Sequence, residues 1–314
     1  MKQVFIVNPL SETVAKKGSV LKSIAQADTT TIPQSDISYF EVDFSGSIDT
    51  TIAQAANGGA EHIFIEGGDG TTQGILTAFF RHKSKFKTFP KFTLLRGGMT
   101  NQVSKTIGLK NRQPSKIQNT MQFIGTKTHH IPMLKIRSDG HPDYFGFLFS
   151  TGAVPMITDY TKREVHKKGI GGSSAVAAGI LKGVSGRADD VMSKTALTLN
   201  ISGPTQCSIS ENHLGTLVTT LPSLIMGLDP FWGTEDAPLR LTVAGEHTRK
   251  LYKHVPAIWL GRKHVSREMD GLQSYNADCL SYSYNGPIVL DGEPVDFNGQ
   301  DFEISATEPI QFVY

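Results

Sequence analysis

Apolar and polar residues follow two different rhythms along the first 110 residues of the chain. Short apolar runs, which are typical of buried strands, occur at residues 4–7, 37–42, 63–65 and 92–95. Between them, apolar residues recur at helical spacing, which predicts helices at residues 19–27, from an Asp49 cap to Gly58-Gly59, after residue 71 and at 101–107. Strands and helices in alternation indicate a mostly parallel sheet with helices on both faces.

The pattern changes after about residue 130, where short strands and turn residues dominate. Strands are predicted at residues 133–136, 144–149, 195–201, 215–220, 240–243, 255–260, 280–284 and 287–290, and one helix at 174–181. A succession of short strands is typical of a sandwich or a barrel. We therefore predict two domains, residues 1–130 and 131–301.

Two glycine-rich turns come directly after predicted strands of the first domain. One reads Gly-Gly-Asp-Gly-Thr at residues 67–71, and the other is Gly97-Gly98. Glycines let backbone N–H groups approach a phosphate, and the following helix directs its positive end at the charge. Asp69 fits beside a phosphate if a divalent cation bridges the two, or if it anchors the loop. A structural turn that binds nothing is the alternative.

Four marks of the sequence, taken in order, resemble the lipid kinase family that contains diacylglycerol kinases and sphingosine kinases. They are Asn8-Pro9, the run at residues 67–71, Gly-Gly-Met-Thr-Asn at 97–101 with a helix that closes at 107–109, and Leu-Asp-Gly-Glu at 290–293. The segment 167–183 is also similar to the family. The resemblance covers nearly the whole chain and is weakest between residues 185 and 280.

This resemblance implies an α/β fold in which an N-terminal Rossmann-like nucleotide-binding domain precedes a C-terminal β-sandwich domain, with the active site in the cleft between them. It also implies that the last segment, about residues 302–314, returns to the first domain. The implied activity is ATP-dependent phosphorylation of a hydroxyl group of a lipid, a diacylglycerol or a sphingoid-type acceptor, with ATP and Mg²⁺ as cofactors.

The resemblance also suggests roles for single residues. The residues expected to hold ATP are Asn8, Gly67, Gly68, Gly70, Thr71, Gly98, Thr100 and Asn101. Asp291 is the expected base for the proton of the acceptor hydroxyl, Glu293 supports it, and Asp69 organises the loop or the water shell of Mg²⁺. Because Asp-Gly is common in hairpin turns, an ordinary turn at residues 291–292 is the alternative.

The second glycine loop departs from the family pattern Pro-x-Gly-Thr-x-Asn-Asp. Arg96 stands in place of the Pro, Met99 in place of the Thr and Gln102 in place of the last Asp. These departures keep two other interpretations open. One is a kinase of a soluble acceptor such as NAD, because NAD kinases share the Gly-Gly-Asp-Gly-Thr loop. The other is a nucleotide-binding regulator without catalysis.

Composition narrows the choice of partners and compartment. The net charge of +2 is too weak to predict nucleic-acid binding. Cys207 and Cys279 form no metal or redox motif, so we expect both to be reduced and buried. Since no segment is long and apolar enough to span a bilayer, we expect a cytoplasmic protein, at most peripheral to a membrane. The basic run at 162–168 is a candidate contact for anionic lipid or for ATP phosphates. A homodimer stays open.

Overall fold

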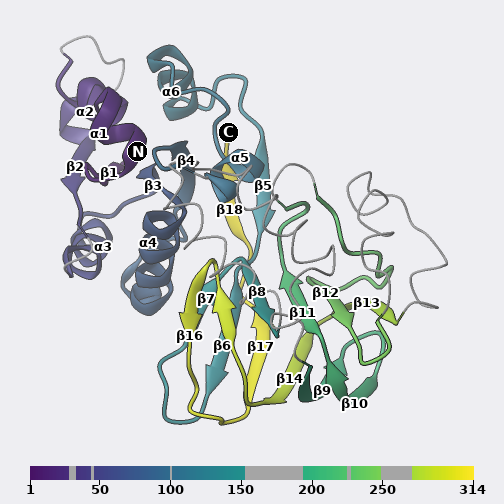
Figure 1. Cartoon of the computed structure of the whole chain (residues 1–314). Helices are drawn as coiled ribbons and strands as arrows, with labels where there is room; N and C mark the ends of the chain where they lie inside the picture. Colours follow the sequence, from purple (N-terminus) through teal and green to yellow (C-terminus); the bar gives the residue numbers. More distant parts are fainter. Residues whose placement is uncertain (28–32, 44–45, 100, 153–193, 225–227, 249–270) are drawn as a thin grey trace. The chain divides into compact units, whose positions relative to one another are not determined.

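The structure is a computed structural model that describes residues 1–27, 33–43, 46–99, 101–152, 194–224, 228–248 and 271–314 (Figure 1). The chain divides into two compact units. Unit 1 contains Met1–Ile131 together with Pro309–Tyr314, and unit 2 contains Pro132–Glu308. The expected return of residues 302–314 to the first domain is wrong at its start, because residues 302–306 form a strand of a unit 2 sheet.

Unit 1 contains a six-stranded sheet with the order β2-β1-β3-β4-β18-β5. Its strands are β1 (Gln3–Val7), β2 (Ile37–Glu41), β3 (His62–Gly67), β4 (Lys91–Arg96), β5 (Thr128–Ile131) and β18 (Ile310–Val313). The pairs β1–β2, β1–β3, β3–β4 and β4–β18 are parallel, and β5 pairs antiparallel with β18. The sheet is therefore mostly parallel, as the alternating pattern predicts.

Six α-helices are described in unit 1. They are α1 (Glu12–Lys17), α2 (Val20–Ala25), α3 (Ser47–Asn57), α4 (Asp69–His82), α5 (Gln102–Ile107) and α6 (Pro114–Met121), with short 3-10 turns η1 (Gln34–Asp36) and η2 (Lys83–Lys85). The expected cap at Asp49 is wrong: α3 begins at Ser47 after Gly46, and Asp49 lies inside its first turn. An acidic residue there still faces the positive end of the helix favourably.

Helices cover both faces of this sheet. On one face, Phe5 of β1 shares a core cluster with Leu21 of α2 and Ile117 of α6. On the other face, Phe79 of α4 packs edge-on against Phe92 of β4, with ring centroids 5.2 Å apart. Because α4 starts directly after β3, its first turn lies at the carboxyl ends of the parallel strands. That is the edge where open α/β sheets bind ligands.

Unit 2 contains two six-stranded sheets, ordered β10-β9-β14-β17-β6-β7 and β13-β12-β11-β8-β15-β16. The first comprises β6 (Leu134–Ser138), β7 (Tyr144–Gly146), β9 (Thr195–Ser202), β10 (Cys207–His213), β14 (Cys279–Tyr284) and β17 (Phe302–Ala306). The second comprises β8 (Leu148–Thr151), β11 (Gly215–Thr219), β12 (Leu239–Ala244), β13 (Leu272–Ala277), β15 (Ile288–Leu290) and β16 (Glu293–Val295). All neighbouring strands pair antiparallel, and one buried cluster contains side chains of both sheets, such as Leu199 and Leu241.

The single strand predicted at residues 144–149 is two strands. β7 pairs with β6 in the first sheet, whereas β8 pairs with β11 and β15 in the second. The chain changes sheets at Phe147, whose backbone N–H donates to the carboxylate of Asp291 instead of to a neighbouring strand. A side chain therefore supplies the hydrogen bond that the sheets cannot supply at this crossover.

The structure corrects or leaves untouched several smaller expectations. Cys207 and Cys279 are free thiols as predicted, but both are half-buried rather than buried. The predicted strand at 255–260, the predicted helix at 174–181 and the basic run at 162–168 lie outside the described residues. Within the described part of the chain, no helix combines the length and apolarity needed to cross a membrane.

Candidate functional site

The two glycine turns of unit 1 pack against each other, backbone to backbone. The Gly97 N–H donates to the Gly67 carbonyl at 2.9 Å. A Cβ atom added to Gly98 would lie 2.5 Å from the Cα of Gly68, and one added to Gly97 would lie 2.7 Å from the Cα of Gly67. Real Cβ atoms do not approach so closely, so glycine is required here by the contact between the two turns.

Asn8 and Thr71 fix the first turn from two sides. Asn8 Nδ2 donates to Thr71 Oγ1 at 2.9 Å, and Asn8 Oδ1 accepts from the backbone N–H of Leu10. The Thr71 side chain lies over Gly67, where a Cβ would come within 2.7 Å of it. Asn8 and Thr71 are 2% and 1% exposed. Both residues were expected to hold ATP, and in the structure their buried side chains hold the loop itself.

Asp69 connects the first turn to the second. Its Oδ2 accepts from the backbone N–H of Gln102 at 2.9 Å, and its Oδ1 accepts from that of Val103 at 3.0 Å. These are N–H groups of the first turn of α5, which have no partner within their own helix. Burial raises the pKa of Asp69, and the two amides oppose that effect. Of the two roles expected for Asp69, these contacts are those of a loop anchor.

Asn101 closes the second turn. Its Oδ1 accepts from the backbone N–H of Gly98 at 2.8 Å, and its Nδ2 donates to the carbonyl of the same glycine. The residue has φ 52° and ψ 41°, in the left-handed region that asparagine tolerates better than most residues. Thr100, which was also expected to hold ATP, lies outside the described residues.

The start of α4 is the open part of this arrangement. The helix has 14 residues, its N-cap residue Gly68 has no side chain that could cap it, and the Ser11 hydroxyl accepts from the Gly68 N–H at 3.3 Å. A Cβ added to Gly70 would have nothing within 4 Å, so no neighbour in the described protein requires glycine there. A free helix N-terminus with space above it is the geometry in which proteins bind phosphate groups.

A buried carboxylate beneath the turn was not found from the sequence. Glu66, at the end of β3, is fully buried and accepts hydrogen bonds from the Ser19 hydroxyl and from the backbone N–H groups at the start of α2. It also forms an ion pair with Arg112, which donates in addition to the carbonyl of Gly18. A charged residue within an apolar strand was the available signal, but its partners are 46 and 47 residues away in sequence.

Asp291, in unit 2, lies in a hairpin turn. Leu290 of β15 pairs with Glu293 of β16, and Asp291 and Gly292 form the two-residue loop with φ of 50° and 90°. Two positive φ values are the mark of a type I′ turn, for which Asp-Gly is a preferred pair. The carboxylate accepts from the backbone N–H groups of residues 147 and 148 at 2.8 to 3.0 Å. Asp291 is half-buried, and Glu293 is exposed.

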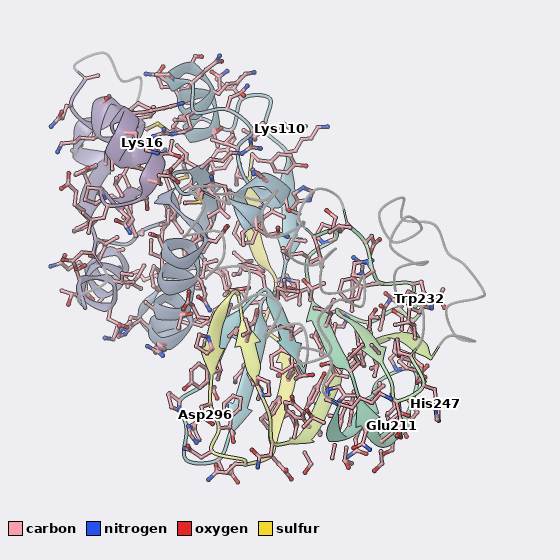
Figure 2. The ribbon with its side chains drawn as sticks, in the orientation of Figure 1. Lys16, Lys110, Glu211, Trp232, His247 and Asp296 are labelled. Atoms are coloured by element: carbon pink, nitrogen blue, oxygen red, sulfur yellow. The ribbon has the colours of Figure 1, made fainter. Side chains whose placement is uncertain are left out.

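Two further residues with ring side chains have partners within their own unit. Trp232 is half-buried at β13, where its backbone N–H donates to the Ser274 hydroxyl, and Figure 2 shows it among the strands of unit 2. His129 of β5 stacks on Tyr314 at 4.5 Å. Among the described residues, no group of three or more His, Cys, Asp or Glu side chains is arranged to hold a metal ion.

Comparison with known proteins places this arrangement in context. Residues 2–136 match the diacylglycerol kinase catalytic domain family. A probable lipid kinase YegS-like protein of Stenotrophomonas maltophilia (strain K279a) is 27% identical over 160 residues, which are 51% of this chain and 48% of that relative. The match therefore spans about half the length of the curated relative.

Solved structures resemble the whole chain. A diacylglycerol kinase from Bacillus anthracis str. Sterne has a TM-score of 0.61 at 14% identity, covering 100% of this chain and 96% of the other. A putative diacylglycerol kinase from the same strain has a TM-score of 0.66 at 15% identity, with the same coverage. At this level of identity, the likeness is one of fold.

Proposed function

We propose that this chain is a diacylglycerol kinase-like protein and an ATP-dependent kinase of a lipid hydroxyl group, because residues 2–136 match the catalytic domain of that family. The observation that carries the proposal is the start of α4, where Gly70 leaves space that no described residue fills. Backbone N–H groups and the helix dipole at this end favour a phosphate group. A glycine inside a helix costs about 1 kcal/mol relative to alanine, which fits a position kept open for a ligand.

The proposed fold has the same two parts as the family resemblance. Unit 1 is the Rossmann-like nucleotide-binding domain, since its parallel strands meet the glycine turns at their carboxyl ends. Unit 2 is a β-sandwich, since side chains of its two antiparallel sheets share one core cluster.

The proposed reaction is transfer of the γ-phosphoryl group of ATP to the acceptor oxygen. A bond forms between that oxygen and the γ-phosphorus, the bond from the γ-phosphorus to the β–γ bridging oxygen breaks, and ADP leaves. Asp291 accepts the hydroxyl proton. The amides of residues 147 and 148 fix the orientation of the Asp291 carboxylate for this role.

The described residues contain no group of three or more His, Cys, Asp or Glu side chains arranged to hold Mg²⁺. Both oxygens of Asp69, the acidic residue of the first turn, already accept backbone N–H groups, and no cluster of metal-binding side chains is present in the described part of the chain. The ion therefore enters the proposal as a partner of the ATP phosphates alone, and no step is assigned to it.

Gly70→Ala tests the nucleotide site. The added methyl group meets no atom of the described residues within 4 Å, so the variant should be as stable as the wild type or more stable by up to about 1 kcal/mol. ATP affinity should fall at least about tenfold, because the methyl group occupies the space of the phosphate. Thermal unfolding and isothermal titration with ATP measure the two effects. Unchanged ATP affinity in a folded variant would show that the start of α4 is not the nucleotide site.

The acceptor is tested by transfer of labelled phosphate from ATP to diacylglycerol, sphingosine, ceramide and NAD, presented in detergent micelles or in solution. Labelled lipid is the expected product, and labelled NAD would favour the soluble-acceptor alternative.

A nucleotide-binding regulator without catalysis is the second candidate, and the backbone contacts of the Asp291 carboxylate favour it, since they are those of a structural turn. ATP binding without transfer to any acceptor would support that candidate.

A further inference from the structure

Arg96 ends β4 and directly precedes the second glycine turn. The strand register pairs it with Gly67, the first glycine of the other turn. Because side chains alternate along a strand, Arg96 lies on the same face of the sheet as Phe92. This is the face on which α4 packs, through Phe79. Arg96 therefore belongs to the carboxyl edge of the sheet, where the free N-terminus of α4 also lies.

Arg96 has no anion beside it in the described part of the chain. The residue is half-buried, and its Nε is buried without a hydrogen-bond partner. Asp69 directs its two oxygens to the backbone N–H groups of residues 102 and 103. Arg112, the arginine at the opposite face, forms an ion pair with Glu66. Burying part of a guanidinium group costs free energy unless a partner compensates for it.

Two residues of α5 also have polar side-chain atoms that lack a hydrogen-bond partner. Gln102 Nε2 and Ser104 Oγ are also buried without hydrogen-bond partners, and Ser104 is 4% exposed. Three such atoms therefore fall within residues 96–104 of the described chain. The Nε of Arg96 and the Nε2 of Gln102 can only donate, so the group that completes this stretch must accept hydrogen bonds. An acceptor that is also negatively charged satisfies the arginine as well.

We propose that Arg96, assisted by Gln102, binds phosphate oxygens of the nucleoside triphosphate, which makes Arg96 a binding residue particular to this chain. The inference rests on the proposed function and adds to it. The family pattern has Pro and Asp where this chain has Arg96 and Gln102, so the loop gains a cation and loses an anion. Its charge is more positive by two, in the direction that favours a polyphosphate. Guanidinium groups suit phosphate because their N–H groups match two oxygens at once.

The test is isothermal titration of the full-length protein and its variants with ATP, ADP and AMP. Arg96→Gln should lower ATP affinity by about 10- to 100-fold, the usual effect of losing a charged hydrogen bond. The loss should shrink from ATP to ADP to AMP as phosphates are removed. Arg96→Pro, which restores the family residue, should weaken ATP binding similarly. Arg96→Lys should retain part of the ATP affinity, because lysine keeps the positive charge but lacks the paired N–H groups of a guanidinium.

Arg81→Gln is the matched control. Arg81 is exposed near the other end of α4, so its removal changes the net charge equally and should leave ATP affinity unchanged. Equal ATP affinity in wild type and Arg96→Gln would overturn the proposal, and so would a loss of equal size in Arg81→Gln. If Arg96→Gln fails to fold, Arg96→Lys decides alone. ATP binding weaker than that of the wild type would support the proposal, and equal ATP binding would overturn it.

Two further outcomes separate this inference from the proposed function. A wild-type protein that binds no ATP would overturn both. ATP binding that is independent of residue 96 would overturn the inference and leave the kinase proposal standing. Titration with a short-chain phosphatidate tests a lipid phosphate as the other source of the same chemistry. If Arg96→Gln loses affinity for phosphatidate but not for ATP, the nucleotide assignment is wrong.

Discussion

Asp69 in unit 1 and Asp291 in unit 2 are held in the same way by different local structures. Each carboxylate accepts hydrogen bonds from two consecutive backbone N–H groups, those of residues 102–103 for Asp69 and those of residues 147–148 for Asp291. Asp69 is the first residue of a helix and connects two glycine turns. Asp291 lies in a left-handed turn, and its carboxylate accepts the backbone N–H groups at the point where the chain changes sheets.

A residue of a sequence motif can be present for its chemistry or for the structure that it holds together. Both aspartates lie in short sequences that predict chemistry, and both make contacts that explain their presence through structure alone. At both aspartates each oxygen accepts a backbone N–H, and the surroundings of Asp69 are those of a helix terminus. At Asp291, the φ of 50° suits asparagine as well as aspartate, so the charge can be removed with little change to the turn. Asparagine substitutions therefore distinguish a chemical role from a structural one.

The largest effect is expected for Asp291→Asn. If Asp291 accepts the hydroxyl proton, the rate of phosphate transfer should fall by about 10²–10⁴-fold. The asparagine oxygen still accepts an N–H at the sheet crossover, so the melting temperature and the ATP affinity should change little. Transfer assays, thermal unfolding and ATP titration measure the three quantities. Full activity in this variant would reduce Asp291 to a turn residue, equivalent to Asp69 in unit 1.

The next effect concerns Asp69→Ala. Removing the carboxylate leaves the backbone N–H groups of residues 102 and 103 without their partner, at a cost of about 2–4 kcal/mol in the free energy of unfolding. Asp69→Asn keeps one acceptor oxygen and should lose about half as much. Urea unfolding of both variants measures the difference. Equal stability of Asp69→Ala and wild type would mean that α5 does not depend on this contact.

Gly98→Ala should separate the two glycine turns. Its new Cβ would lie 2.5 Å from the Cα of Gly68, so the turns must move apart, at a cost of about 1–3 kcal/mol. ATP affinity should fall with stability, because the same movement displaces the start of α4. Gly46→Ala gives the control for glycine loss without crowding: no atom of the described residues lies within 4 Å of its added Cβ, although its φ of 96° adds backbone strain. A stable Gly98→Ala protein with normal ATP affinity would contradict the packing argument.

The glycine turns show what the sequence can predict and where it stops. The pattern of apolar runs located β1, β3 and β4 and the turns that follow them, because strand periodicity and glycine are local signals. The partners of these turns are not local. The Asn8 contact to Thr71 and the Glu66 ion pair with Arg112 join residues 63 and 46 positions apart, and only the folded register brings them together.

Unit 2 was harder to predict for a related reason. β10 and β13 consist largely of polar residues whose partners are neighbouring strands, so their sequences have no apolar run. β17 was expected to return to the first domain by resemblance, yet Phe302 and Ile304 are buried in the unit 2 core. The motif at residues 290–293 was found, but its contact with Phe147 depends on a sheet crossover that no local pattern encodes.

The smallest effect concerns the proton of Asp69. Burial, the larger influence, raises its pKa, whereas the amides of residues 102–103 and the charge of Lys105 lower it. With a raised pKa, the folded protein holds the proton more tightly than the unfolded chain. The stability from this group is therefore complete below the ordinary value of 3.8 and is lost as the pH rises through the folded value.

Because Asp69→Asn has no proton to lose, the wild-type free energy of unfolding minus that of the variant should be largest near about pH 3 and should fall as the pH rises. Urea unfolding at several pH values between about 3 and 6 measures this difference. Asp291→Asn is followed in parallel to separate a local effect from a general acid response. A difference for Asp69 that grows with pH would mean that the amide donors outweigh burial, and that Asp69 acts as an ionised cap of α5.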